Sequence, residues 1–326
     1  MDHLNIREID KAHTRIKSFI LRTPLISNET INKITQGNIF FKLENLQNTG
    51  SFKIRGAINK ISQLSKNSKL RGIISYSSGN HAQAVAHASK IFNTNATIVM
   101  PMNAPKVKIQ NTKKYGAKII FYDPTKTDRE SIAKKIALRE NKEIIMPYDD
   151  LDIIAGQGTS GKEIAEDLLK MKIIPDIFLC CCGGGGLIAG SSTYLKKKFP
   201  KIKNFSVEPK YLNDTELSLK KNRIIKNKKS AHSICDALLA PQPGKLTFPI
   251  NKKNLNGGLS VTDQEVKNTI KTLAETIKIV AEPGGAVAAA ALLNKKINFK
   301  NKNVVVMISG GNIDYDLFSS ISLKIK

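Results

Sequence analysis

The sequence lacks tryptophan and has only four cysteines among its 326 residues. Three of them, Cys180, Cys181 and Cys182, are adjacent, and neighbours on a strand point to opposite faces, which excludes a disulfide framework. A metal site at these cysteines would need a spaced pair. We therefore expect small buried apolar side chains in a reducing cytosol, which predicts a cytoplasmic protein.

Long apolar segments and an export signal are also missing. No run of about 18 apolar residues occurs, so the sequence predicts no membrane span. The first five residues lack the charged-then-apolar pattern of an export signal. With 41% hydrophobic and 24% charged residues, the composition is that of an ordinary globular chain, and the length allows two lobes.

Arginine is scarce although the formal net charge is +25. Only 8 of the 52 basic residues are arginine, and the lysines are spread along the chain without interleaved aromatics. No zinc, RNP-type or helix-turn-helix pattern is present, so we predict no nucleic-acid partner. A nucleic-acid-binding protein is the alternative of another class, and salt-dependent DNA binding would indicate it. The positive charge would attract anionic small molecules.

Short β-branched runs alternate with helical stretches along the chain. This pattern predicts an α/β protein with parallel-rich sheets, right-handed crossovers and flanking helices. Two lobes with a cleft between them are the simplest arrangement. A mobile surface insert is expected at 211–229. Strands are expected at 38–44, 72–77, 96–101, 118–123, 143–148, 176–182, 204–208, 258–261 and 303–309, and helices at 81–91, 105–115, 128–141, 187–198, 263–277 and 284–293.

The segment around Lys53 is the most informative part of the sequence. Small and polar residues, Thr49, Gly50 and Ser51, precede this lysine, and a helical pattern follows it. Lys53 is therefore expected at a loop-to-helix junction, where backbone amides can bind an anion. A lysine held there can act as a nucleophile or carry a Schiff base. For a lysine taken at random, a solvated helix start would be the simpler interpretation.

Four consecutive glycines, Gly183 to Gly186, follow a predicted buried strand and precede a predicted helix. Bare amides and the helix dipole make such a turn an anion site, and a flexible tight turn is the simpler alternative. No Gly-Lys-Ser/Thr follows, which excludes a nucleotide-triphosphate loop, and the acidic residue of the dinucleotide fingerprint is not clearly placed. A short cup of amides suits a single phosphate.

An imine-forming lysine and a cup for one phosphate together suggest pyridoxal phosphate as cofactor. On these residues the chain resembles the fold-type II pyridoxal-phosphate enzymes, which have the architecture of the tryptophan synthase β chain. It is most similar to the branch of threonine/serine ammonia-lyases, serine racemases and 3-hydroxyaspartate ammonia-lyases. The matching segments are 42–57, 77–83, 155–159, 183–187, 207–209, 282–285 and 309–312, so the resemblance covers almost the whole chain.

The resemblance implies roles for the site residues. Lys53 would bind the cofactor as a Schiff base and then remove the α-proton of the substrate. Ser309 would hydrogen-bond the pyridine nitrogen without holding it protonated, which favours β-elimination over transamination. The remaining cofactor-binding residues would be Gly183, Gly184, Gly185, Gly186 and the amide of Leu187 at the phosphate, Asn80 at the ring hydroxyl, Phe52 at the ring face, and Glu282 in its matching segment.

A second anion loop comprises Ser77, Ser78, Gly79, Asn80 and His81, after a predicted strand and at the start of a predicted helix. Its amides suit a carboxylate, and the resemblance implies that it binds the α-carboxylate of the substrate. In racemase-like relatives a serine at position 78 faces the cofactor opposite the lysine and can exchange the α-proton, whereas many dehydratases carry alanine. We hypothesise that Ser78 permits racemisation or the use of a D-configured substrate.

Glu208 and Asp214 resemble the divalent-cation site of the racemase and hydroxyaspartate branch. The carbonyl of Leu212 would be the third protein ligand, and this set suits Mg²⁺ or Ca²⁺. Two acids on a loop are also commonly solvated without a metal. One departure from the relatives lies nearby, because Ala237 follows Cys235 and Asp236 where a glycine is usual. Its methyl group could narrow the pocket or shift substrate preference.

We predict β-elimination of L-threonine or L-serine to a 2-oxo acid and ammonia. Serine racemase and 3-hydroxyaspartate ammonia-lyase are the alternatives within the branch, and β-replacement, as in cysteine synthase, is a further one. The resemblance implies a single catalytic unit with a small lobe at 71–149 and a large lobe at 1–70 and 150–326. It also implies a homodimer without a C-terminal regulatory domain.

Overall fold

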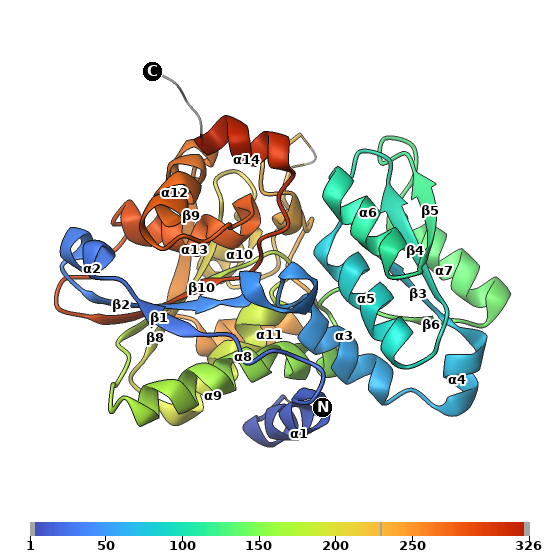
Figure 1. Ribbon diagram of the computed structural model, residues 1–326, viewed down its shortest axis with the longest axis horizontal. Helices are drawn as coiled ribbons and strands as arrows, with labels where there is room; N and C mark the ends of the chain where they lie inside the picture. Colours follow the sequence, from blue (N-terminus) through green and yellow to red (C-terminus); the bar gives the residue numbers. More distant parts are fainter. Residues whose placement is uncertain (1–3, 229, 323–326) are drawn as a thin grey trace.

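The computed structural model describes residues 4–228 and 230–322, and these form two groups of elements, each built on its own sheet. Figure 1 shows the group around β3, β4, β5 and β6 on the right and the group around the other strands on the left. We call them the small lobe and the large lobe. The α/β class and the parallel-rich sheets predicted from the sequence are confirmed. The lobe boundaries near 71 and 149 stay predictions.

The large lobe is built on a six-stranded sheet of order β1-β2-β10-β7-β8-β9. All neighbours are parallel except β1 and β2, so the carboxyl ends of five strands meet at one edge. Strands β7 and β10 lie in the middle and are apolar along their length, as expected for strands covered on both faces. The strands are β1 (Leu25–Ser27), β2 (Asn38–Leu43), β7 (Ile177–Cys181), β8 (Lys203–Pro209), β9 (Gly257–Val261) and β10 (Asn303–Ile308).

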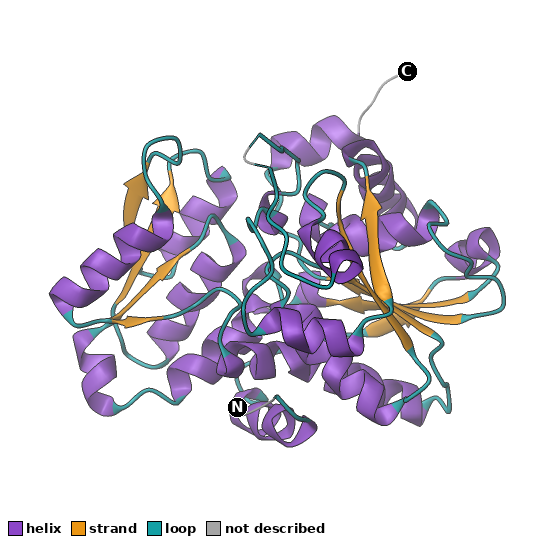
Figure 2. Ribbon diagram, turned by 180° about the vertical axis from the view of Figure 1, so that it is seen from behind, coloured by secondary structure: helices purple, strands orange, loops and turns teal. Residues whose placement is uncertain are grey.

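Helices cover both faces of this sheet (Figure 2). Helix α13 packs on β7, β8 and β10 and is itself backed by α12, while α9 contacts β7 from a layer that also contains α8 and α11. Helix α13 is almost entirely alanine, valine and leucine and is buried, which explains its lack of a polar face. The helices of the large lobe are α1 (Ile6–Ile16), α2 (Glu29–Thr35), α8 (Leu151–Lys170), α9 (Gly186–Lys198), α10 (Asp214–Lys221), α11 (Thr247–Asn254), α12 (Asp263–Thr276), α13 (Pro283–Leu293) and α14 (Tyr315–Ser322).

The small lobe is built on a parallel four-stranded sheet of order β5-β4-β3-β6. Helix α7 covers one face of this sheet and α5 covers the other. Parallel pairing requires crossovers, which explains why a helix follows each of the first three strands. The elements are β3 (Ile73–Tyr76), β4 (Ala96–Pro101), β5 (Lys118–Tyr122), β6 (Glu143–Ile144), α4 (Lys66–Arg71), α5 (Asn80–Ile91), α6 (Lys106–Lys114) and α7 (Arg129–Glu140).

Helix α3 (Lys53–Ser62) lies between the lobes and contacts both α5 and α8. It crosses α8 closely, because a Cβ atom at Gly156 would lie 2.6 Å from the Cα atom of Gly56. The close crossing explains why both positions are glycine. Lys53, the first residue of α3, is therefore held between the two lobes.

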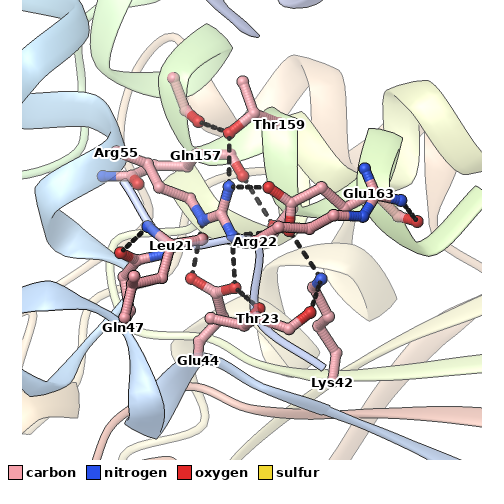
Figure 3. Close-up of polar contacts among 12 residues, drawn as sticks. Leu21, Arg22, Thr23, Lys42, Glu44, Gln47, Arg55, Gln157, Thr159 and Glu163 are labelled. Atoms are coloured by element: carbon pink, nitrogen blue, oxygen red, sulfur yellow. Dashed lines mark hydrogen bonds and ion pairs between the residues drawn. The ribbon is translucent and has the colours of Figure 1, made fainter. Parts of the chain in front are cut away.

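A buried network of four charged side chains fixes α3 to its neighbours (Figure 3). The Arg55 guanidinium binds both carboxylate oxygens of Glu44 and both of Glu163 at 2.7–2.8 Å. Lys42 Nζ lies 2.6 Å from Glu163 Oε2. All four side chains are at most 1% exposed, and their two positive and two negative charges balance. A balanced, fully hydrogen-bonded set is the form in which charges are tolerated in a protein interior.

Most of the predicted strands and helices are confirmed within one or two residues, but two expectations are wrong and several elements were not predicted. The strand expected at 143–148 ends at Ile144, because Pro147 and the segment after it turn toward the other lobe. The insert expected at 211–229 contains α10, whose Asp214 and Thr215 are buried, and residue 229 lies outside the described residues. The longest of the elements that were not predicted is helix α8, with 20 residues.

The expected state of the cysteines is confirmed, since all four are free and buried. Across residues 4–228 and 230–322, no helix combines the length and apolar character needed to cross a bilayer.

Candidate active site

One pocket between the lobes collects every cofactor-binding and substrate-binding residue predicted from the sequence. The small lobe contributes the loop after β3, and the large lobe contributes the loops after β7 and β10, so the pocket lies at carboxyl ends of parallel strands. The predicted residues in its lining are Phe52, Lys53, Ser77, Ser78, Gly79, Asn80, His81, Gly183, Gly184, Gly185, Gly186, Leu187, Glu282 and Ser309.

Lys53 extends into this pocket from the first turn of α3. Its Nζ donates a hydrogen bond to the carbonyl of Pro147 at 2.7 Å and lies 5.2 Å from the centroid of the Phe52 ring. Burial lowers the pKa of Lys53 from 10.5 to about 8, and the positive charge of Arg129 acts in the same direction. About a tenth of this amine is therefore neutral at pH 7, far more than for a lysine with a pKa of 10.5, and a nucleophilic lysine needs the neutral form.

Two glycines shape the glycine loop, because a side chain at either position would meet a neighbouring side chain. Gly185 has φ +94°, and a Cβ atom there would lie 2.6 Å from Asn251 Nδ2. A Cβ atom at Gly184 would lie 2.3 Å from the ring of Tyr148. The carbonyl of Gly184 accepts the hydroxyl of Thr247 at 2.6 Å, which turns the loop's carbonyls outward.

The amides of this loop are left available for an anion. No described residue supplies an acceptor to the amides of Gly183, Gly184 or Gly185, and the loop runs directly into α9, a helix of 13 residues. Amides at a helix N-terminus favour negative charge, so the loop fits a phosphate group. With Lys53 in the same pocket, the residues present fit pyridoxal phosphate.

The small-lobe loop has the form of a carboxylate site. Ser77 Oγ accepts the amide of Gly79 at 3.1 Å, and α5 starts at Asn80. Burial lowers the pKa of His81 to about 3, and Lys53 adds to this effect, so the imidazole is neutral. Its Nε2 lies 3.2 Å from the carbonyl of Ile145 and must donate to it, which leaves Nδ1 as an acceptor without a partner among the described residues. Ser78 is half-buried in the pocket wall.

Ser309 directly follows β10, is only 4% exposed and lines the pocket, and we call this part of the pocket its floor. Its carbonyl accepts the amide of Phe52 at 3.2 Å, and Ser51 forms a bridge with Gly310. The lysine-bearing segment is therefore joined to the end of β10. A neutral hydroxyl at the floor would accept or donate one hydrogen bond without adding charge.

Glu282 lies at the start of α13 and joins three parts of the site. It accepts a hydrogen bond from the side-chain amide of Asn80 and forms an ion pair with Lys108 at 2.8 Å. Asn80 in turn accepts the side-chain amide of Asn312 at 2.9 Å. Glu282 is 1% exposed, and its burial raises the pKa of its carboxyl group, an effect that Lys108 opposes.

Sequence reasoning missed several residues of the pocket lining, among them Lys108, Arg129, Tyr148, Gln157 and Cys181. Lys108 could not be singled out from the sequence, because it is one of 44 lysines. Neither Lys108 nor Arg129 lies in a recognisable motif. The contact between the Tyr148 ring and Gly184 could not be predicted, because it depends on how the folded chain packs. Gln157 lies in a segment that matches the family, and Cys181 lies next to one. Both could have been assigned to the pocket, because the helix and strand periodicities predict which of their side chains share a face.

The predicted cation ligands lie outside this pocket, at the end of β8 and the start of α10. Glu208 accepts the amides of Thr215 and Glu216 at 2.9 and 2.8 Å. Asp214 is 1% exposed, and its Oδ2 atom has no partner among the described residues. Burial raises the pKa of Glu208, as does Asp214, and burial raises the pKa of Asp214 to about 7.

Neither Glu208 nor Asp214 forms an ion pair with a described lysine or arginine. Within residues 4–228 and 230–322, no three His, Cys, Asp or Glu side chains come together as a metal cluster. The predicted site needs only two carboxylates and the carbonyl of Leu212, whose residue is 5% exposed. Two buried carboxylates without a cation fit a divalent metal, and the site stays a prediction.

Comparison with known proteins agrees with this geometry. The sequence profile of the family described as pyridoxal-phosphate dependent enzyme matches residues 16–310. The chain therefore belongs to the pyridoxal-phosphate dependent enzymes, and pyridoxal phosphate is its cofactor.

Within that family, the relatives carry the names of the branch that the sequence resembles. A serine racemase of Schizosaccharomyces pombe is 39% identical over 312 residues, which are 96% of this chain and 95% of the relative. An L-threo-3-hydroxyaspartate ammonia-lyase of Saccharomyces cerevisiae is 39% identical over 310 residues, 95% of this chain and 94% of the relative. The crystal structure of a threonine deaminase from the organism abbreviated T.th. has a TM-score of 0.90 at 32% identity and covers 95% of this chain and 99% of that one.

Proposed function

We propose that this enzyme catalyses β-elimination of a 3-hydroxy amino acid, L-threonine or L-serine, to a 2-oxo acid and ammonia. The observation that carries the proposal is the single pocket that holds the lysine with lowered pKa, the glycine loop, the carboxylate loop and Ser309. Threonine would give 2-oxobutanoate and serine would give pyruvate. Water leaves from the β-carbon and is taken up again when ammonia is released, so the net products are the 2-oxo acid and ammonia.

Bound pyridoxal phosphate supplies an electron sink for the pair of electrons left at the α-carbon. The protein residues divide the remaining work. The glycine loop, with the amide of Leu187, would hold the phosphate, and Lys53 Nζ would bind the cofactor covalently. Once the substrate amine had displaced it, the free Lys53 amine would accept the α-proton. Phe52 lies against the lysine and excludes water from one side of the pocket.

The loop from Ser77 to His81 would orient the substrate. The amides at the start of α5 would bind the α-carboxylate, and the neutral His81 would add no positive charge to it. Ser309 would offer a hydroxyl to the pyridine nitrogen of the cofactor and, being uncharged, would not hold that nitrogen protonated. A weaker electron sink favours prompt loss of the β-hydroxyl over transamination.

The proposal is tested with purified protein and a substrate panel. Borohydride reduction after saturation with pyridoxal phosphate should label Lys53, as located by mass spectrometry, and Lys53→Ala should lose both the label and turnover. L-Threonine, L-serine and L-threo-3-hydroxyaspartate are then compared for release of 2-oxo acid and ammonia. Absence of 2-oxo acid from all three substrates would overturn the proposal.

A second candidate, 3-hydroxyaspartate ammonia-lyase activity, is favoured by Arg129. This residue is the first of α7, lines the pocket and is half-buried, with its Cζ 5.9 Å from the centroid of the Tyr76 ring. No described carboxylate forms an ion pair with it. A guanidinium without a partner in a substrate pocket suits a second carboxylate on the substrate.

Arg129→Gln separates the two candidates. If hydroxyaspartate is the preferred substrate, this change should lower its kcat/KM by about a hundredfold and leave L-serine within about threefold of wild type. Equal effects on both substrates would instead give Arg129 a general role and favour the threonine/serine activity. Oxaloacetate would be the product from hydroxyaspartate.

We also propose that the enzyme binds a divalent metal, forms a homodimer and is located in the cytoplasm. Serine racemase activity is the remaining alternative. Ser78 supports racemisation, and the buried pair Glu208 and Asp214 supports Mg²⁺ or Ca²⁺. Sedimentation of the purified protein tests the dimer, and cell fractionation tests the location.

A further inference from the structure

Lys108 is a buried cation that reaches from the small lobe into the large lobe. It lies in the first turn of α6, which Figure 1 shows on the side of the small lobe toward the large lobe. Its side chain is 0% exposed, and its Nζ lies 2.7 Å from Asp236 Oδ2 and 2.8 Å from Glu282 Oε2. Burial acts to lower the pKa of Lys108, but the two carboxylates outweigh it and raise that pKa, so the ammonium stays charged.

The backbone of the same turn is held by the large lobe as well. The carboxylate of Asp314, which precedes α14, accepts the amide of Val107 at 2.9 Å and the amide of Lys106 at 3.2 Å. Three consecutive residues of α6 therefore bind three carboxylates of the large lobe. Such a concentration of contacts between lobes indicates a defined docking point, and Lys108 is the buried one of these three residues.

Lys108 also supports the carboxylate loop from beneath. A Cβ atom at Gly79 would lie 2.2 Å from Lys108 Cδ, so the lysine stem packs directly against the backbone of that loop. The next residue, Asn80, donates to Glu282, the same carboxylate that binds Lys108. One cation thus contacts the loop expected to hold the substrate and the large-lobe carboxylates beside the cofactor pocket.

We propose that Lys108 is a positioning residue that locks the lobes together and sets the position of the substrate loop relative to the cofactor floor. The substrate part of this inference rests on the proposed function. The lock depends on charge, because removal of the ammonium leaves Glu282 and Asp236 facing each other without a cation. The small lobe and its Ser77–His81 loop would then separate more readily from the large lobe.

Lys108→Met tests this, since methionine keeps most of the stem and removes the charge. Lys60→Met is the matched control, because Lys60 also binds two carboxylates, those of Asp150 and Asp152 at 2.7 and 3.1 Å, but does not line the pocket. Amide hydrogen exchange is measured in the cofactor-loaded proteins. In Lys108→Met, exchange at 77–83 and 106–114 should accelerate about tenfold, while α12 is unchanged. Lys60→Met should leave these segments as in wild type.

Kinetics supply the second measurement. Lys108→Met should raise KM for the preferred substrate about tenfold, with kcat changed less and cofactor affinity within about twofold. Lys108→Arg, which keeps the charge, should show a smaller rise in KM than Lys108→Met. Unchanged exchange at 77–83 and an unchanged KM would overturn the role of Lys108, as would loss of cofactor affinity with KM unaffected.

A milder variant covers the case in which Lys108→Met does not fold. Asp236→Asn removes the partly exposed partner, 27% exposed, and leaves the pair with Glu282, so a smaller acceleration of exchange in the same two segments is expected. No acceleration in that variant would also overturn the proposal. The exchange measurement needs no turnover, so failure of the proposed function, seen as absence of 2-oxo acid from wild type, is distinguished from failure of this inference.

Discussion

The carbonyl of Ser309 accepts the backbone amide of Phe52 at 3.2 Å. This bond joins the end of β10 to the residue before Lys53, although the two lie at opposite ends of the chain. The backbone segments that carry Lys53 and Ser309, the predicted cofactor-binding amine and hydroxyl, are therefore held side by side.

Cofactor capture by the apoenzyme should follow the ionisation of Lys53. Burial lowers the pKa of this amine from 10.5 to about 8, and only the neutral form attacks an aldehyde. The rate of capture should therefore rise with pH to a midpoint near 8, as measured by growth of the cofactor absorption band. A midpoint near 10.5 would show that the amine behaves as an exposed lysine.

Gly185→Ala should weaken cofactor binding about tenfold or more, because a side chain at φ +94° costs about 1–3 kcal/mol and its Cβ would meet Asn251. Gly183→Ala is the matched control in the same loop. A Cβ atom there would lie 3.4 Å from Leu238, an ordinary contact, so its effect should be small. Equilibrium titration with pyridoxal phosphate compares the two. Equal losses would show that the loop shape is not the determinant.

Ser78→Ala tests whether this enzyme racemises its substrate. Ser78 lies in the pocket wall and is the residue expected to exchange the α-proton. The rate at which D-serine forms from L-serine should fall by about a hundredfold, the usual contribution of a general acid or base, while β-elimination to pyruvate is largely kept. Racemisation at the wild-type rate would refute the role of Ser78.

The pair Glu208 and Asp214 should make metal-free protein sensitive to pH. Folding raises the pKa of Asp214 from 3.8 to about 7, so the folded state favours the protonated acid. The contribution of Asp214 to stability is fully present below 3.8, the pKa in the unfolded chain. It is lost as the pH rises through about 7, the pKa in the folded protein. In chelator, the Tm should therefore fall between about pH 5 and pH 7, and Asp214→Asn should flatten this fall.

Calcium gives the complementary measurement. If the two carboxylates and Leu212 bind a divalent ion, Ca²⁺ should raise the Tm of wild type at about pH 8 and leave Asp214→Asn unchanged. A similar rise in both proteins would place the ion elsewhere.

Arg55→Met should destabilise the protein by about 3–5 kcal/mol, because it leaves Glu44 buried without its cation. Arg22→Met is the control. Arg22 also binds two carboxylates, Glu166 and Asp167, but its side chain is 41% exposed, so its loss should cost no more than about 1 kcal/mol. Denaturant unfolding measures both. Comparable losses would show that burial of the Arg55 network contributes little.

Sequence reasoning was most successful where a local pattern fixes the backbone. The glycine run at 183–186, between a strand pattern and a helix pattern, predicted a tight turn into a helix. Strand β4 (Ala96–Pro101) was predicted with its observed bounds from its β-branched residues. Lys53 was singled out by its own segment, a small polar run before a helix start, which is a local property of the chain. Ser309 was assigned through the resemblance, and both residues line the pocket, while their roles stay predictions.

The parts that were missed depend on tertiary contacts. Helix α8 was overlooked because Gly156, Gly158 and Gly161 weaken a helical pattern, and their reason is close packing against α3 and α9. Lys108 looked like one lysine among many until the fold placed Asp236 and Glu282 beside it. Tyr148 was assigned no role because nothing in its own segment shows that it covers Gly184.

Strand β10 lies between β2 and β7, although it is the last strand to be synthesised. A nascent chain that has not yet released residues 303–308 from the ribosome lacks the centre of its main sheet and the anchor for Phe52. Pyridoxal phosphate should therefore be captured only after β10 has been synthesised, and truncation before β10 should give a colourless product.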